Sequence, residues 1–488
     1  MKSKQEKGSK TGKNGVTEKI RKYLPLVLFT ALLIFTRFYN LPATSRFTRD
    51  ESSNLVDMHR IFVDRDLTLI GPVDVANTII YPSLTFYMLL PFAIIGNFTT
   101  YSPGYGTAFY SVLAALLLLL ITRKMEFREI KIAGLLLIVW YPLMESGRWA
   151  WNPHLVPFVM ALALYFWQVN KRHAFLSGIL FGLVFHLHYF TIFSFAGFSL
   201  MVVIDSIKKK QFKELLLLLA GFALMILPFV IFDLRNPPGL FFGKFLSSNL
   251  VSQGAEGELV NLPLSFIHNL GQSLFYLTQN IYLAIMVGVV FFVLILLDTL
   301  RRRENLLFLV PFLFQILAIS FLPYFQGRYL LLGIVFLFMF LIQKRDGISK
   351  RLVVCAMLLM IVGGAFNLGK VMLESPTPPG AYIVEKASEI ISDDIKFSDL
   401  KNVNLAILAS PDPDPLGVTY RHTLLVKGEK ILTESQYGIT DNLFIVTTSE
   451  ESAVRNDSAN IINGFREGKL VSSQKIGNTN WKVYLFNR

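Results

Sequence analysis

Cysteine is almost absent from this sequence of 488 residues, because Cys355 is the only one and it lies in an apolar stretch. A single cysteine excludes a disulfide within the chain and a metal site built on cysteine ligands. Charged residues are also scarce, at 17% of the chain. Soluble domains carry about 25% charged residues. The composition therefore does not fit an ordinary soluble protein.

Apolar residues take the place of the missing charges: 53% of the chain is hydrophobic, 43 residues are Phe, and the mean hydropathy is +0.49. These values indicate an integral membrane protein surrounded by membrane lipid. The formal net charge of +13 could indicate nucleic acid. However, Lys and Arg occur in short clusters between apolar runs, as they do in cytoplasmic loops. We therefore expect no nucleic-acid partner.

The basic clusters predict the topology, because Lys/Arg-rich loops stay in the cytoplasm and about 20 apolar residues cross a bilayer. The clusters lie at 122–131, 170–173, 208–214, 301–304 and 343–351. The predicted fold is mainly α: a polytopic membrane bundle of about 11–13 helices, about eleven of them full spans, in the plasma membrane. Its parts are a disordered basic cytoplasmic tail, 1–22, and a transmembrane domain, 23–370, with an outer loop, 41–79. The run 79–97, interrupted by Pro82 and Pro91, is expected to lie on the outer side without spanning.

The composition turns polar after residues 374–380, which predicts a small extracytoplasmic α/β domain over 371–488. Periodicity favours helices at 381–396 and 451–465 and strands at 402–409, 442–448 and 480–486. This region contains no Gly-rich phosphate-binding loop. A role in packing or in contact with an acceptor is therefore favoured over independent catalysis.

The predicted topology collects polar residues on the outer side of the membrane. The first outer loop contains the adjacent carboxylates Asp50 and Glu51. Later outer loops contain Arg148, Trp149, Trp151, Asn152, His154, His186, His188, Tyr324, Gln326, Arg328 and Tyr329. Ionisable groups facing a bundle interior are candidates for function, because placing them in lipid is costly. The alternative is that such residues are ordinary loop charges and belong to an aromatic belt.

Four sequence features together resemble the GT-C glycosyltransferases that use lipid-phosphate sugars, particularly the protein O-mannosyltransferases and the aminoarabinose transferases of lipid A. They are the Asp50–Glu51 pair after the first apolar run, "YPSLTFYMLLPFAIIG" at 81–96, "SGRWAWNPHLVP" at 146–157 and "GRYLLLG" at 327–333. The resemblance covers most of 20–345. It implies inverting transfer of a monosaccharide from a polyprenyl-phosphate carrier, at the outer face, to a hydroxyl of a protein, a wall polymer or a glycolipid.

The resemblance assigns the general base to Asp50. Glu51 is expected to orient the loop or contact the acceptor, unless it is an ordinary solvated charge. Arg148 and Arg328 are candidates for the lipid phosphate, because a guanidinium binds phosphate oxygens in a bidentate way. For Arg328 the alternative is snorkelling from a helix end. Further candidates are Tyr329, for the same phosphate, and the substrate-site residues Trp151, Asn152, His154, His188 and Tyr81.

Two departures from the family pattern limit the prediction. Asn152 stands where many related transferases have Asp, so a two-carboxylate metal site is not evident; we expect no cofactor, and a divalent metal is not favoured. Tyr81, not Lys, precedes Pro82, which does not support aminoarabinose as the sugar.

The alternative functions are a transporter or flippase of a lipid-linked substrate, a ligase or polymerase that uses a lipid-pyrophosphate oligosaccharide, and a non-catalytic scaffold. A transporter is disfavoured because no matching halves are found.

Overall fold

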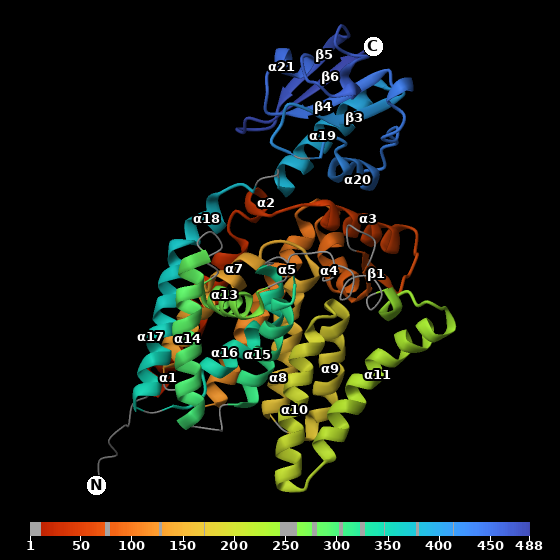
Figure 1. Cartoon of the computed structure of the whole chain (residues 1–488). Helices are drawn as coiled ribbons and strands as arrows, with labels where there is room; N and C mark the ends of the chain where they lie inside the picture. The colour runs from red at the N-terminus through yellow and green to blue at the C-terminus, as the bar shows by residue number, and fades with distance from the viewer. Residues whose placement is uncertain are drawn as a thin grey trace, which may run out of the picture.

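The computed structural model consists of a large helical body and a smaller α/β domain at one end of it (Figure 1). It describes residues 11–73, 79–125, 129–169, 171–244, 261–275, 281–301, 306–322, 327–345, 347–376, 380–412 and 414–488. Tyr324 and Gln326 of the predicted outer loops lie outside these residues, as does part of the loop 235–271.

The helical body contains all elements up to residue 373. Its helices are α1 (Thr11–Phe38), α2 (Leu41–Thr44), α3 (Arg49–Val63), α4 (Leu84–Ile95), α5 (Ser102–Lys124), α6 (Ile130–Val139), α7 (Tyr141–Ser146), α8 (Val156–Val169), α9 (Ala174–Leu187), α10 (Thr191–Lys209), α11 (Lys213–Arg235), α13 (Leu262–Phe275), α14 (Ile281–Arg301), α15 (Leu306–Ser320), α16 (Leu331–Leu341), α17 (Gly347–Phe366) and α18 (Leu368–Leu373). Short 3-10 helices, η1 (Asn152–Leu155) and η4 (Gly327–Leu330), precede α8 and α16.

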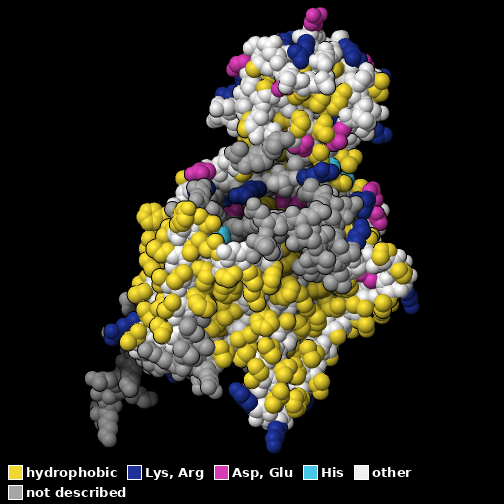
Figure 2. Space-filling view, viewed as in Figure 1, with side chains coloured by type: hydrophobic (Ala, Val, Ile, Leu, Met, Phe, Trp, Pro, Cys, Tyr) yellow, Lys and Arg dark blue, Asp and Glu magenta, His cyan; other side chains and the backbone are white. Residues whose placement is uncertain are grey.

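Four helical segments among the described residues are long and apolar enough to cross a membrane: α5, α10, α11 and the continuous stretch of α17 and α18. Shorter apolar helices accompany them, including parts of α1, α9, α14 and α15. Hydrophobic side chains cover the sides of the helical body (Figure 2). The body is therefore that of a multi-pass membrane protein, and the mainly helical fold class is confirmed.

Two local predictions differ from the structure. Helix α1 already begins at Thr11, so the described part of the tail 1–22 is helical. The boundary predicted at 371 falls inside α18, which continues the body.

The run 79–97, which was expected not to span, forms strand β2 (Ile80–Pro82) and the helix α4 of 12 residues, which is too short to span a bilayer.

Close backbone contact joins α9 to α11. A Cβ atom at Gly178 would lie 2.1 Å from Leu218 O, and a Cβ at Gly221 would lie 2.1 Å from Phe175 O. Only glycine fits at either position, as in other membrane helix pairs that pack through small residues. This contact fixes the packing of the first turns of α9 against α11.

The segment with the two adjacent carboxylates forms the top of the helical body, directly beneath the small domain (Figure 1). A capping box starts α3: Glu51 accepts hydrogen bonds from Thr48 N at 2.7 Å and from Thr48 Oγ1 at 2.5 Å. Asp50 lies in the first turn of this helix, where a negative charge is favourable. The short hairpin of β1 (Ile70–Val73) and β2 follows.

The C-terminal domain consists of a four-stranded sheet with helices on both faces, so the predicted α/β domain is present. Its elements are α19 (Ala381–Ser398), β3 (Val403–Ile407), α20 (Val418–Val426), β4 (Asn442–Thr447), α21 (Glu451–Arg455), β5 (Lys469–Lys475) and β6 (Lys482–Asn487). The strand order is β3-β4-β6-β5, with β3 and β4 parallel. Every residue of β3 and β4 is buried, as expected for strands covered on both faces, although β3 lies at the edge of the sheet.

Three elements of this domain depart from the sequence expectation. Helix α20 and strand β5 were not predicted, and the helix expected over 451–465 ends at Arg455. The side chains of β5 alternate between exposed and half-buried, so this edge strand lacks an apolar run that would reveal it. Helix α20 is short and contains Val and Thr, which are poor helix formers.

Candidate functional site

A cavity of about 230 Å³ opens at the end of the helical body that faces the C-terminal domain. In Figure 2, charged side chains and a histidine gather in the hollow between the apolar body and this domain. The cavity is lined by Arg46, Pro142, Glu145, Trp149, Trp151, His154, Gly327, Arg328 and Leu331. These residues come from the segment before α3, from α7, from the stretch leading to η1, and from η4 and α16. Regions far apart in the sequence thus form one site.

Two arginines and one carboxylate supply the charges of the cavity. Arg46 Nη2 lies 3.4 Å from Glu145 Oε1, and the Arg46 guanidinium lies 5.3 Å from the centre of the Trp149 ring. The Arg328 guanidinium lies 4.3 Å from the centre of the Trp151 ring. Such stacking leaves the edge of a guanidinium available for bidentate hydrogen bonds to a planar or tetrahedral anion. The cavity therefore suits a ligand that carries negative charge.

Aromatic rings form one wall of the cavity. Trp149 and Trp151 stack with their ring centres 4.9 Å apart, and His154 meets both edge-on. Trp149 Nε1 is buried without a hydrogen-bond partner among the described residues. A buried donor of this kind is costly unless a ligand or water accepts from it. The wall therefore offers a flat apolar surface together with a hydrogen-bond donor.

His154 is held neutral by its surroundings. Burial lowers the pKa of His154 to about 3, although a hydrogen bond with Trp149 O opposes this shift. Its Nδ1 lies 3.0 Å from that carbonyl oxygen, which can only accept, so Nδ1 carries the proton. The Nε2 atom of His154 is then an acceptor, suited to a hydroxyl group of a substrate.

A second aromatic cluster continues from Arg328. The Arg328 guanidinium lies 5.2 Å from the centre of the Tyr329 ring, Tyr329 lies 5.1 Å from His188, and His188 lies 5.4 Å from Tyr81. The structure thus joins six of the residues predicted for the site, because Tyr81, His188, Tyr329, Arg328, Trp151 and His154 form a continuous chain of ring and guanidinium contacts.

Arg148 and Asn152 point away from this cavity. Arg148 is buried and donates to the carbonyl oxygens of Thr36, Arg37 and Tyr39, at 2.7–3.1 Å, and to Thr44 Oγ1 at 2.6 Å. Asn152 Nδ2 donates to Leu187 O at 2.7 Å, at the end of α9. Both side chains hold helix ends in place. The structure therefore gives Arg148 a different role from the predicted phosphate ligand, and Asn152 a different role from a substrate contact.

Asp50 and Glu51 differ sharply in their surroundings. Asp50 is half-buried in the first turn of α3, whereas Glu51 is buried and its Oε1 makes no hydrogen bond within the described part of the chain. Glu51 borders a second, much smaller cavity of about 10 Å³. Because both Thr48 hydrogen bonds go to Oε2, Glu51 orients the start of α3. Asp50 is not among the residues that line either cavity.

Glu51 makes the stability of this segment depend on pH. Burial raises the pKa of Glu51 to about 7, with the Asp50 charge adding to the shift and the Thr48 hydrogen bonds opposing it. The protonated carboxyl is thus favoured in the folded state, so its contribution is complete below about pH 4.5 and is lost as the pH rises through 7. We expect Glu51→Gln to remove this dependence. Compared with the wild type, the variant should gain about 1–3 kcal/mol in free energy of unfolding between pH 5 and pH 8. Thermal unfolding of the wild type and the variant in detergent at both pH values measures this difference. A variant whose stability depends on pH as the wild type does would contradict the assignment.

The cavity also contains residues that the sequence interpretation left out of the site. Arg46 stands four residues before Asp50, in the predicted first outer loop. Glu145 begins the stretch 145–154 and carried no family signal. The only sequence hint was their position in outer loops next to the predicted residues.

No metal site is evident in the described ranges, where no group of three or more His, Cys, Asp and Glu side chains could hold an ion. The carboxylates of the cavity region, Glu145 and Glu51, are engaged by Arg46 and Thr48 respectively.

Neither a protein-family model nor a curated protein matches the chain. Among solved structures, the chain is similar to ArnT from Cupriavidus metallidurans, with 12% identity, a TM-score of 0.57 and coverage of 96% of this chain and 98% of that one. That crystal structure contains ArnT bound to undecaprenyl phosphate, and ArnT in the apo state matches with the same values. The likeness extends over the body and the C-terminal domain. The chain thus shares the fold of ArnT, and the predicted helical membrane bundle with a small C-terminal α/β domain is confirmed.

Proposed function

We propose that the protein is a membrane glycosyltransferase that moves a monosaccharide from a polyprenyl-phosphate carrier to an acceptor hydroxyl. One observation carries the proposal: two arginines, Arg46 and Arg328, face a cavity whose wall is a pair of stacked tryptophans. Guanidinium groups suit a phosphate, and aromatic faces suit the apolar face of a sugar ring. The likeness to ArnT, which was crystallised with undecaprenyl phosphate, supports this choice of carrier.

The transfer requires a group that takes a proton and groups that stabilise negative charge, and residues of the protein can supply both. Asp50 takes the proton of the acceptor hydroxyl, whose oxygen forms a new bond to the anomeric carbon. The bond from that carbon to the phosphate oxygen breaks, and the polyprenyl phosphate leaves with the electron pair. Arg328 and Arg46 stabilise the negative charge that develops on the leaving phosphate. A single displacement of this kind inverts the configuration at the anomeric carbon.

The remaining predicted residues are assigned to binding. The Nε2 atom of His154 accepts from a sugar hydroxyl, Trp151 stacks on the sugar, and the cluster of His188, Tyr329 and Tyr81 extends the site beyond Arg328. The distribution of basic loops supports a cavity on the outer face of the plasma membrane, with the N-terminus in the cytoplasm and the C-terminal domain outside. A lipid carrier reaches such a site laterally, whereas nucleotide sugars are confined to the cytoplasm.

Arg328 provides the first test, by binding. Replacing Arg328 with Ala removes a charge-assisted contact, which is worth about 1.5–3 kcal/mol. We therefore expect the affinity for undecaprenyl phosphate to fall about 10- to 100-fold. Native mass spectrometry of the protein in nanodiscs with added undecaprenyl phosphate measures it. Arg123→Ala, at an exposed position at the far end of α5, is the control and should bind as the wild type does.

Turnover distinguishes a transferase from a transporter. The protein in nanodiscs is given undecaprenyl phosphate esters of glucose, mannose, galactose and 4-amino-4-deoxyarabinose, with a protein, glycolipid or wall-polymer acceptor. Release of undecaprenyl phosphate, separated by chromatography, supports the proposal. Unchanged binding in the Arg328→Ala variant, or binding of all four esters without release from any, would overturn it.

A further inference from the structure

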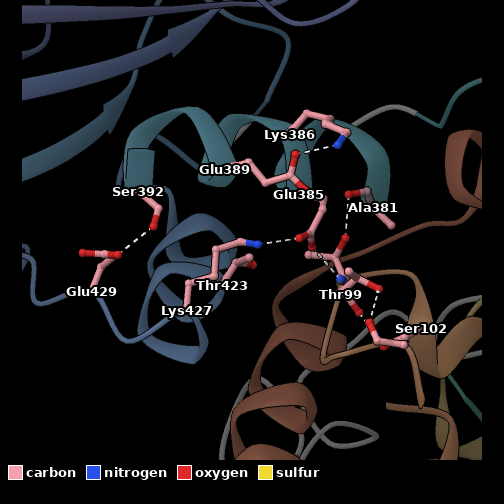
Figure 3. Close-up of polar contacts among 12 residues, drawn as sticks. Thr99, Ser102, Ala381, Glu385, Lys386, Glu389, Ser392, Thr423, Lys427 and Glu429 are labelled. Atoms are coloured by element: carbon pink, nitrogen blue, oxygen red, sulfur yellow. Dashed lines mark hydrogen bonds and ion pairs between the residues drawn. The ribbon is translucent and has the colours of Figure 1, made fainter. Parts of the chain in front are cut away.

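The C-terminal domain packs against the segment that carries Asp50 and makes hydrogen bonds with it. Helix α20 packs against α3, and α19 packs against α2. Figure 3 shows this junction, with α19 and α20 above the helical body and Glu385 between Lys427 and the loop that precedes α5. The domain contributes no residue to the cavity itself.

Glu385 forms the first joint. Its side chain is fully buried and accepts from Thr100 N at 2.7 Å through Oε2 and from Lys427 Nζ at 2.6 Å through Oε1. Thr100 Oγ1 in turn donates to Ala381 O at 2.7 Å. A buried carboxylate is stable only when its charge and hydrogen-bonding capacity are met, so the position of Thr100 relative to α19 is closely defined.

The start of α19 forms the second joint. Ala381 N donates to Ser45 O at 3.0 Å, one residue before Arg46 of the cavity. A Cβ atom at position 380 would lie 2.4 Å from the same Ser45 oxygen, so Gly380 permits a close backbone approach. The chain entering α3 is thereby held from the side of the C-terminal domain.

His422 forms the third joint, on the other side of Asp50. His422 Nδ1 lies 2.9 Å from Ser52 Oγ, and Ser52 Oγ donates to Arg49 O at 2.9 Å. A serine hydroxyl has one proton to donate, so Nδ1 of His422 is the donor in the first bond. Burial lowers the pKa of His422, and the charge of Arg49 adds to this, which keeps the ring neutral. His422 thus bonds to the first turn of α3, within which Asp50 lies.

We propose that α19 and α20 are positioning elements of the transfer reaction: they hold residues 45–52 at Ser45 and at Ser52 and so fix Asp50 and Arg46 relative to the cavity. This inference rests on the proposed function. A displacement of about 1 Å of a reacting group can lower a rate 100-fold, so small changes at these joints are sufficient to affect catalysis. His422 is a positioning residue, because it acts through Ser52 and touches no reacting atom.

Variants at His422 test the proposal in the full-length protein in nanodiscs. His422→Leu removes the bond to Ser52, whereas Asn in His422→Asn carries an amide N–H close to the place of Nδ1. We expect His422→Leu to lower kcat at least tenfold, with KM for the donor changed less than about twofold, because the cavity itself is intact. We expect His422→Asn to recover kcat to within about threefold of the wild type. The donor is the undecaprenyl phosphate ester that the wild type consumes fastest.

A double-mutant cycle locates the effect. Ser52→Ala removes the other partner of the same bond, so Ser52→Ala combined with His422→Leu should lower kcat no further than either change alone. Lys482→Ala is the matched control, because Lys482 pairs with Glu450 within the C-terminal domain, away from α3. This variant is expected to retain wild-type kcat.

Amide hydrogen exchange gives a readout that does not require activity. Peptides covering 45–63 should exchange at least fivefold faster in His422→Leu and in Glu385→Ala than in the wild type, while peptides from β4 and β6 remain protected. Unchanged exchange in 45–63, a kcat within twofold of the wild type in both variants, or an additive double mutant would overturn the inference. If the four donors are not consumed but exchange in 45–63 rises, the proposed function fails and the junction is still shown to hold α3.

Discussion

Replacing Asp50 with Asn is expected to lower transfer at least 100-fold while the amount of folded protein stays unchanged. General base catalysis contributes about 100- to 10,000-fold to a rate. Asn retains the shape of Asp and its place in the first turn of α3, but it cannot take a proton from the acceptor hydroxyl. The measurement is release of undecaprenyl phosphate from the preferred donor, with the affinity for undecaprenyl phosphate measured on the same preparation. We expect this affinity to change less than twofold.

Asp57→Asn is the matched control for this prediction. Asp57 lies on the same helix as Asp50 but beyond its first turn, near Arg60, with Asp57 Oδ1 3.4 Å from Arg60 Nη2. This variant should transfer at the wild-type rate. Wild-type turnover in Asp50→Asn would exclude Asp50 as the base, and a loss of equal size in Asp57→Asn would point to a general effect of charge on α3.

The fold was predictable from the sequence because the membrane imposes strong rules. Apolar runs and basic clusters define where helices begin and end, and the turn at 188–190 between α9 and α10 falls where the predicted outer loop lies. Strands β3 and β4 were recognisable as mainly apolar runs buried on both faces. Helix α20 was not, because its nine residues carry no clear apolar period. The contact of His422 with α3 was therefore not predictable from the sequence.

The site was predictable only in part, for a different physical reason. Hydropathy indicates the level of a residue along the membrane normal, but not the direction of its side chain. Arg328 and Arg148 stand at the same predicted level; Arg328 stacks on Trp151 at the cavity, whereas Arg148 turns inward to backbone carbonyls. Carbonyl groups at the end of a helix attract cations in any sequence, so no local pattern distinguishes the two arginines. Contacts between distant segments decide between them.

Replacing Arg148 with Ala is expected to destabilise the protein by about 1–3 kcal/mol or more, because it leaves several buried carbonyl groups without hydrogen bonds. The guanidinium closes the end of α1: it donates to Thr36 O, Arg37 O and Tyr39 O, groups that have no partner within the helix at its C-terminus. It also reaches Thr44 Oγ1 of α2, and so links α1 to the segment that leads to α3. Thermal unfolding in detergent and the yield of monodisperse protein measure the effect.

Binding of undecaprenyl phosphate separates this structural role from the role of phosphate ligand that the sequence suggested. If Arg148 holds α1 and α2, Arg148→Ala lowers the unfolding temperature, and the protein that remains folded binds undecaprenyl phosphate within about threefold of the wild type. If Arg148 binds phosphate, the variant unfolds at the wild-type temperature and loses affinity instead, as expected for Arg328→Ala. Arg148→Lys sharpens the comparison, because lysine keeps the charge but lacks the planar fork that reaches several oxygens at once. We expect it to be destabilised almost as much as Arg148→Ala, and wild-type stability in both variants would contradict the structural role.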